Sequence, residues 1–444
     1  FGTNWAYYSH YVGDIFGAPL AIEALMAFFL ESTLVGLFFF GWDRLSKEKH
    51  LAVTWLMALG TNLSALWILI ANGWMQHPIG SEFNIDTMRM ELASFSEVVF
   101  NPVAQVKFVH TVSAGYVTGA IFVLAISSWY LLKGRDLAFA RRSFAIASAF
   151  GLASALSVIV LGDESGYELG DVQKVKLAAV EAEWQTHPAP AAFTVFGIPN
   201  EETQTTDYAL KIPAVLGLIA TRSLDEPVPG LAELKAKHLE RIIRGQEAYV
   251  LMLQYRAGDK SPATVNRFNE IKEDLGYGML LTAYTDDVAN ATAEHIAQAV
   301  EDSVPQVWPL FWSFRIMVAC GFAMLLLFAL AFWHSAKRTV DKPKWLLKFA
   351  VFSLPLPWIA CEAGWFVAEY GRQPWAIGEI LPTHLAVSQL TVTDIWISLI
   401  SIMVLYTIFV IIEMWLMTKY AKLGPSSLHT GKYDLESPAV AKEA

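Results

Sequence analysis

The stretch PLFWSFRIMVACGFAMLLLFALAFW, residues 309–333, holds one charged side chain and is long enough to cross the roughly 30 Å hydrocarbon core of a bilayer as a helix. Backbone groups in lipid must be hydrogen-bonded internally, and the alternating segments typical of a membrane barrel do not occur. The sequence therefore predicts an all-α integral membrane protein, a bundle of about seven transmembrane helices. The expected spans are 18–41, 52–74, 107–132, 143–161, 309–333, 346–369 and 392–418.

The composition supports the same class of protein. Of the 444 residues, 55% are hydrophobic and 17% are charged, and the mean hydropathy is +0.39, which excludes an ordinary soluble enzyme of several domains. Cys320 and Cys361 both fall within expected spans. We therefore expect them to be packing residues, not part of a disulfide framework or a thiolate metal site.

Lysine and arginine in the connections predict the orientation. Every second connection is basic, and the positive-inside rule places such connections in the cytoplasm. The polar insert at 162–308 then lies on the outer face. We expect transmembrane helices at 1–161, an outer loop domain at 162–308, further transmembrane helices at 309–418 and a cytoplasmic tail at 419–444.

The insert has its own pattern. Its acidic residues outnumber its basic ones by roughly two to one, in a chain whose net charge is −10. LAELKAKHLERIIRGQEAYVLMLQYR, residues 231–256, predicts an amphipathic helix, whereas HPAPAAFTVFGIPNEETQTTD, residues 187–207, predicts a loop. The short polar segment after Tyr420 predicts a disordered tail.

Of the ten histidines, only His110 lies within an expected span. Such a residue either hydrogen-bonds to a neighbouring helix or serves a cofactor. Met317 lies on another span at comparable depth, and a histidine with a methionine can fill both axial positions of a low-spin haem iron. Arg315 would suit a haem propionate. The structural alternatives are packing for Met317 and snorkelling to the headgroups for Arg315.

Carboxyl groups also occur in the spans. Glu23 and Glu31 share the first apolar stretch, which contains no Lys or Arg, so we expect a proton relay or, alternatively, neutral hydrogen bonds between helices. Glu362 and Glu369 end the sixth stretch among aromatic residues, followed by Arg372. A carboxylate can ligate a high-spin haem iron with an arginine near a propionate, although an interfacial aromatic belt explains the same run.

The opening of the insert places Lys176 and Glu181 on a short expected helix. A solvated helix face is the simplest interpretation. If a quinol docked there, a carboxylate would take a hydroxyl proton and an ammonium would hold the developing oxyanion.

Five blocks carry a resemblance to a known family. GWFVAEYGRQPW, VKFVHT, FRIMVACGF, GDESGYE and NGWMQHP resemble subunit I of the cytochrome bd-type quinol oxidases, in the long-insert type found in proteobacteria. The resemblance covers essentially the whole chain. It implies nine membrane helices, a low-spin haem b, a high-spin haem b and a haem d near the outer face, a second large subunit and a small single-helix subunit. The insert would be a periplasmic quinol-binding loop of a bacterial inner-membrane protein.

The resemblance also implies residue roles. His110 and Met317 match the axial pair of the low-spin haem b, with Arg315 beside it, and Glu369 matches the ligand of the high-spin haem b. The remaining matches are Lys176 and Glu181 for quinol oxidation, Glu23 and Glu31 for the haem d vicinity and its proton supply, and Trp365 and Arg372 for the surroundings of the high-spin pair. A further family histidine would lie upstream of Phe1, so we expect the chain to start within a longer protein.

The expected function is therefore oxidation of ubiquinol or menaquinol on the periplasmic side and reduction of oxygen to water, which generates a proton-motive force without pumping. A relative with only b-type haems is a rival from the same family. A polytopic transporter is a rival from another class, and it would need neither His110 nor Met317. Nucleic-acid binding is not expected.

Overall fold

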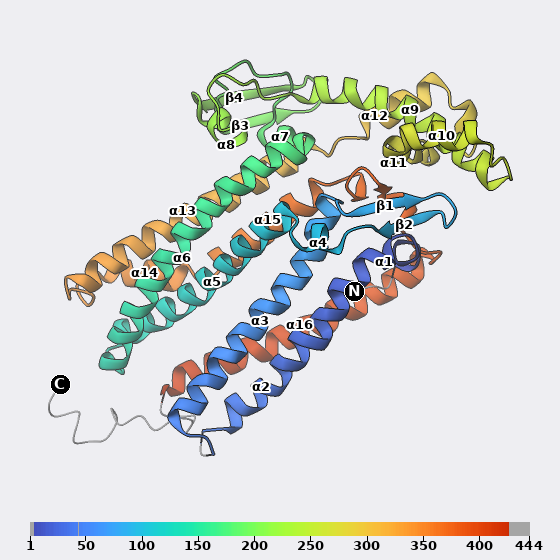
Figure 1. Ribbon diagram of the computed structural model, residues 1–444. Coiled ribbons are helices and arrows are strands. Elements are labelled where there is room, and N and C mark those ends of the chain that lie inside the picture. Colours follow the sequence, from blue (N-terminus) through green and yellow to red (C-terminus); the bar gives the residue numbers. More distant parts are fainter. Residues whose placement is uncertain (1–3, 43, 426–444) are drawn as a thin grey trace.

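The computed structural model describes residues 4–42 and 44–425. It contains six helices that are long and apolar enough to cross a membrane, or up to seven if one bent pair counts as a span. These helices form an elongated bundle with the insert across one end (Figure 1), which confirms the predicted all-α membrane fold. The spans are Ala6–Phe40, Lys47–Gln76 (α3), Phe95–Lys133, Leu137–Val172 (α6), Val307–Ala336 (α13), Val392–Leu423 (α16), and Lys344–Phe352 (α14) with Leu356–Tyr370 (α15), which are bent by 41°.

The first span is longer than the apolar run predicted. It consists of α1 (Ala6–Ile22), a π-helical segment η1 (Glu23–Phe28) and α2 (Phe29–Phe40). The prediction began at residue 18 because polar side chains upstream lower the local hydropathy. The helix nevertheless starts earlier, because one face of its first turns is buried in an apolar cluster that includes Tyr8, Val12 and Ile15.

The fourth span, α6, also outruns its prediction, which ended at residue 161. The helix continues through GDESGYELGDV to Val172. Glycines on this extension allow α8 (Val215–Ala220) of the insert to approach closely, since a side chain at Gly170 would collide with the backbone of Ala220. The end of α6 therefore anchors the insert to the bundle.

The best-buried part of the bundle lies between α5 (Pro102–Lys133), α6, α13 and α14. Asn101 caps α5 by accepting hydrogen bonds from the backbone of its first turn, and Pro102 starts the helix, where a missing N–H costs nothing. The helices approach closely because Gly151 lies against the ring of Phe328. The core includes Val117, Ile121, Leu124, Phe144, Leu327, Phe328, Leu346 and Leu347.

Short elements close the bundle on the insert side. A hairpin of β1 (Ser81–Asn84) and β2 (Arg89–Leu92) and the helix α4 (Phe95–Val99) join α3 to α5. After α15, β5 (Trp375–Ile377) pairs with β6 (Leu381–Pro382), and η5 (Thr383–Leu385) leads towards α16. These short elements follow directly on the C-terminal ends of α3 and α15.

The insert folds in two parts (Figure 1). The first begins with α7 (Lys174–Glu181) and contains an antiparallel hairpin of β3 (Phe193–Asn200) and β4 (Thr205–Ile212), then α8. The second is helical, and α9 (Leu231–Arg256) confirms the predicted amphipathic helix residue for residue. Its other elements are α10 (Pro262–Ile271), η2 (Lys272–Asp274), α11 (Leu275–Leu280), η3 (Leu281–Ala283), η4 (Val288–Asn290) and α12 (Ala293–Glu301).

The loop predicted over residues 187–207 was wrong, because the β3–β4 hairpin occupies most of it. The register shifts between Thr194 and Phe196 and again between Phe196 and Ile198. These irregularities, with a glycine and a proline inside β3, interrupt the alternation by which a strand is recognised in a sequence.

α16 is open on all sides, because none of its most apolar window is buried within the chain. The two cysteines are free, in agreement with the predicted absence of a disulfide. Most of the predicted tail, from residue 426 onwards, lies outside the described residues.

Candidate functional site

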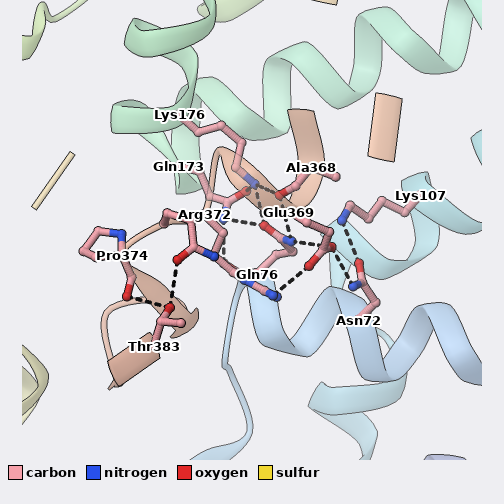
Figure 2. Close-up of polar contacts among 11 residues, drawn as sticks. Asn72, Gln76, Lys107, Gln173, Lys176, Ala368, Glu369, Arg372, Pro374 and Thr383 are labelled. Carbon is pink, nitrogen blue, oxygen red and sulfur yellow. Dashed lines mark hydrogen bonds and ion pairs between the residues drawn. The ribbon is translucent and has the colours of Figure 1, made fainter. Parts of the chain in front are cut away.

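Glu369 lies in the last turn of α15, where the bundle meets the insert (Figure 2). Its Oε1 accepts hydrogen bonds from Asn72 Nδ2 at 2.9 Å and Gln76 Nε2 at 3.3 Å, and its Oε2 accepts one from Arg372 Nη2 at 2.7 Å. Asn72 and Gln76 share one face of the last turns of α3, because residues four apart on a helix are neighbours. The carboxylate is thus held in one orientation by donors on both of its oxygens.

Lys107 extends this cluster from α5. Its Nζ donates to Asn72 Oδ1 at 2.8 Å and lies 6.0 Å from the centre of the Trp365 ring, within cation–π range. Trp365 is 40% exposed, so it stands at the rim of the cluster and not within it. Of the two predicted neighbours of the high-spin site, Arg372 contacts Glu369 directly and Trp365 lies near Lys107.

Lys176, on α7, reaches the same cluster from the insert. Its Nζ donates to Gln76 Oε1 at 2.5 Å, Gln173 Oε1 at 2.9 Å and the Ala368 carbonyl at 2.9 Å (Figure 2). Burial, and then the neighbouring positive charges, lower the pKa of Lys176 well below its ordinary value. Three oxygen acceptors surround Nζ, and an ammonium has one hydrogen for each of them.

Glu181 lies at the other end of α7 and has a different partner. Its Oε2 accepts a hydrogen bond from Arg315 Nη2 at 3.0 Å, and both side chains are buried. Arg315 also donates to the carbonyls of Thr194, Val180 and Phe311. Burial raises the pKa of Glu181 to about 7, while Arg315 opposes the rise. A carboxyl group with this pKa can gain or lose a proton near neutral pH.

His110, on α5, faces α6. Its ring lies beside Gly162, where an added Cβ would be 3.5 Å from Cε1, and its Nδ1 is buried without a hydrogen-bond partner among the described residues. The backbone of Val158, also on α6, interacts with the ring, which fixes the position of the imidazole between the two helices.

Met317, on α13, faces α15. A Cβ at Gly364 would lie 3.0 Å from its sulfur, so the absence of a side chain at Gly364 makes room for the thioether. His110 and Met317 lie on different helices, α5 and α13. They belong, however, to one ring of contacting helices, since α5 packs on α6, α6 on α13, α13 on α15 and α15 on α5.

Glu23 and Glu31, on the first span, both face α3. Glu23, the first residue of the π-helical segment, accepts a hydrogen bond from Ser64 at 2.6 Å. Glu31 packs against Gly60, with its Cβ 3.7 Å from where a glycine side chain would begin. π-Helical turns inside α-helices occur frequently at functional sites, because they re-aim a side chain.

A cavity of about 730 Å³ opens between the bundle end and the insert. It is lined by the Glu369 cluster on one side and by α9 and α11 on the other, and its walls include Gln76, Gln173, Lys176, His238, Arg241 and Arg372. Burial lowers the pKa of His238 to about 4, so this histidine is neutral at physiological pH. The cavity therefore opens onto Gln76 and Arg372, the partners of Glu369, and onto Lys176, while Glu369 itself is not among the residues that line it.

The family resemblance implies haem, and the residues present fit it. The Nε and Nη1 atoms of Arg372 are buried without partners among the described residues. A guanidinium with two free donors matches a carboxylate such as a propionate, and an imidazole with a methionine on a neighbouring helix matches an axial pair. The orphaned atoms are thus of the kinds that haem would satisfy.

Comparison with known proteins gives the family of the chain. Residues 1–425 match the family described as cytochrome bd terminal oxidase subunit I, so the chain belongs to that family of membrane-bound terminal oxidase subunits.

Among its relatives is the cytochrome bd-II ubiquinol oxidase subunit 1 of Escherichia coli (strain K12), which is 58% identical over 430 residues, covering 97% of this chain and 84% of that protein. The cytochrome bd ubiquinol oxidase subunit 1 of Bacillus subtilis (strain 168) is 33% identical over 436 residues, covering 98% and 80%. The solved bd oxidase from Geobacillus thermodenitrificans shares the fold, with a TM-score of 0.69 at 24% identity over 96% of this chain and 82% of that one.

Four residues that the structure places around Glu369 were not predicted from the sequence: Asn72, Gln76, Lys107 and Gln173. Asn72 and Gln76 stand in the quoted block NGWMQHP, and their spacing by one helical turn was the available signal. Arg315, predicted beside a haem propionate, lies in the structure against Glu181 of the insert.

Proposed function

We propose that this chain is the haem-carrying subunit of a quinol:oxygen oxidoreductase, which oxidises quinol at the insert and reduces oxygen to water within the bundle. Its membership of the terminal oxidase family supports this function. The observation that carries the proposal is the partly buried Glu369 carboxylate, which accepts hydrogen bonds from Asn72, Gln76 and Arg372, the last of which has two free donor atoms.

His110 and Met317 would hold a low-spin haem b, and Glu369 a high-spin haem b. A haem d completes the set, with Glu23 and Glu31 in its vicinity. When bound, these haems carry electrons and bind oxygen. Arg372 would pair with a propionate through Nε and Nη1, and Trp365 would cover the rim of the site.

Glu181 is the proposed proton acceptor for quinol. With a pKa of about 7 it is partly ionised near neutral pH, which suits a general base. Arg315 holds the carboxyl group in place and favours its charged form. Lys176, the second residue proposed for quinol oxidation, lies on the same helix at the end nearer Glu369.

Glu23 and Glu31 would supply protons from the cytoplasmic side. Both lie on the first span, whose C-terminal end leads into a connection rich in basic residues. Ser64, on α3, donates a hydrogen bond to Glu23. Quinol protons released outside and oxygen protons taken from inside make the reaction electrogenic without a pump. Glu31→Ala should slow oxygen reduction while quinol still reduces the low-spin haem, and unchanged turnover would exclude the relay.

As a subunit of a multi-subunit oxidase, the chain requires partners. We propose a second large subunit and a small single-helix subunit, in a bacterial inner membrane with the insert in the periplasm. The uncovered surface of α16 is consistent with a lipid or protein neighbour. The substrates are ubiquinol or menaquinol and O2.

The test is spectroscopic. Enzyme purified with its partner subunits should give pyridine haemochrome spectra of both b and d haems, and His110→Ala or Met317→Ala should abolish the low-spin signal in the reduced-minus-oxidised spectrum. A spectrum with b haems alone would favour the b-only relative, and a colourless preparation would refute the proposal.

A further inference from the structure

We propose that Gln76 is a positioning residue that couples Lys176, on the insert, to the carboxylate of Glu369, so that Lys176 acts on the haem-ligand side of the enzyme and not by direct contact with quinol. The inference rests on the proposed assignment of Glu369 as a haem ligand. It assigns a function to a residue of the block NGWMQHP to which the sequence analysis gave no role.

The side chain of Gln76 is fully engaged (Figure 2). Its Nε2 donates to Glu369 Oε1 at 3.3 Å and to the Ala368 carbonyl at 3.2 Å. Its Oε1 accepts from Gln173 Nε2 at 2.9 Å and from Lys176 Nζ at 2.5 Å. A glutamine amide offers two donor hydrogens and two acceptor lone pairs, so none remains free, and the side chain is only 2% exposed.

The chemistry of the partners fixes which way the amide points. An ammonium can only donate, whereas a carboxylate and a carbonyl can only accept, so the oxygen of Gln76 must face Lys176 and its nitrogen must face Glu369. A glutamate here would set a second acceptor against Glu369, and a leucine would remove every contact. Only an amide of this length joins the two groups.

Lys176 has no donor left for a substrate. An ammonium has three hydrogens, and Gln76, Gln173 and the Ala368 carbonyl accept all three. The side chain is 3% exposed. Glu181, at the far end of the same helix, is instead engaged with Arg315. α7 therefore presents one residue to the proposed quinol side and one to the Glu369 side.

This arrangement lets a displacement of α7 reach Glu369. α7 has only eight residues, so its two ends move together. A shift at Glu181 changes the position of Lys176, and Gln76 passes that change to the carboxylate. Removal of a residue that orients a metal ligand typically lowers activity or metal affinity about 10- to 100-fold.

The experiment compares Gln76→Leu and Gln76→Glu with Gln105→Leu in the purified multi-subunit enzyme. Gln105 is a matched control, because it lies at the same end of the bundle and donates only to the Val99 carbonyl. We expect both Gln76 variants to change the high-spin ferric signal in electron paramagnetic resonance and to lower kcat at least about tenfold. The low-spin spectrum and the KM for quinol should be retained, and Gln105→Leu should match the parent.

Lys176→Met supplies the second arm. It should produce the same change in the high-spin signal, and the double variant with Gln76→Leu should be no worse than either single variant, since the two residues act as a unit. A raised KM for quinol with an unaltered high-spin signal in Lys176→Met would overturn the inference, as would an unaltered signal in Gln76→Leu. If Gln76→Leu does not assemble, the nearly isosteric Gln76→Glu decides.

Glu369→Ala separates this inference from the proposed function. Retention of the high-spin haem in Glu369→Ala would refute the ligand assignment itself. Loss of that haem, together with unaltered signals in the Gln76 and Lys176 variants, would refute the coupling alone.

Discussion

Glu369 and Glu181 are carboxyl groups at the junction of the bundle and the insert, but their surroundings differ: the Glu369 side chain is 37% exposed, whereas Glu181 is buried. Glu369 accepts hydrogen bonds from Asn72, Gln76 and Arg372 on both of its oxygens. Glu181 has one side-chain partner, Arg315, and its pKa is raised to about 7. The comparison shows how one fold separates a fixed ligand from a proton acceptor: many donors hold a carboxylate still, while burial with a single partner leaves it able to exchange a proton.

The largest effect is expected from Glu369→Ala. Removal of the carboxylate should eliminate oxygen reduction and the high-spin haem, because the remaining donors offer no ligand in its place. Haem content and oxygen consumption measure this result. Asn72→Leu is the graded companion, and it should retain the haem with about tenfold lower turnover. Full haem content and full activity in Glu369→Ala would show that Glu369 is not a haem ligand, and the proposed contrast with Glu181 would then fail.

Arg315→Met should move the pH profile. Burial and the nearby Glu183 raise the pKa of Glu181, and Arg315 lowers it, so loss of Arg315 raises that pKa above about 7. Glu181 accepts a proton only when it is ionised, hence the acid limb of kcat/KM should move to higher pH. If the pKa rises by about one, the rate on that limb falls about tenfold. An unmoved limb would show that Arg315 does not act on Glu181.

Gly364→Ala probes the Met317 side with a smaller expected effect. The added Cβ would lie 3.0 Å from the Met317 sulfur, so the thioether must move by a few tenths of an ångström. We expect a shift in the low-spin haem spectrum and about twofold lower turnover, because overpacking of this size is partly relieved by a flexible side chain. Gly321→Ala on α13 is the control, since nothing lies within 4 Å of its added Cβ.

The smallest effect is expected at the end of the bundle far from the insert. Arg141 and Asp341 form an ion pair at 2.8 Å, with both side chains about half exposed. Exposed pairs contribute less than about 1 kcal/mol, so Arg141→Ala should leave turnover, spectra and the pH profile unchanged. A spectral change here would mean that the effects of the variants near the insert are not local.

The fold could be predicted largely from the sequence. Apolar runs located the spans because lipid requires them, and the amphipathic period identified α9. The β3–β4 hairpin was not predicted, because register shifts interrupt the alternation of inward and outward side chains along β3. The early start of the first span was not predicted, because its first turns are stabilised by tertiary contacts, which a hydropathy profile does not take into account.

The candidate site, too, could be predicted only in part from the sequence. Glu369 stands in the block GWFVAEYGRQPW, whereas Glu181 was assigned a role only through the family resemblance. Gln76 did not stand out, because an amide near the end of a helix has no distinctive pattern and its partners lie far away in the chain, at Ala368 and Glu369. Only the folded arrangement shows that Lys176 and Glu181 face different neighbours.

The most direct test of this division is a single-turnover experiment, in which oxygen-free enzyme is mixed with quinol and then with oxygen. In Glu181→Gln, all haems should be present but quinol should reduce the low-spin haem at least about 100-fold more slowly. In Glu369→Ala, quinol should reduce that haem at the parent rate, and no oxygen should be consumed. Equal defects in both steps for both variants would contradict the account.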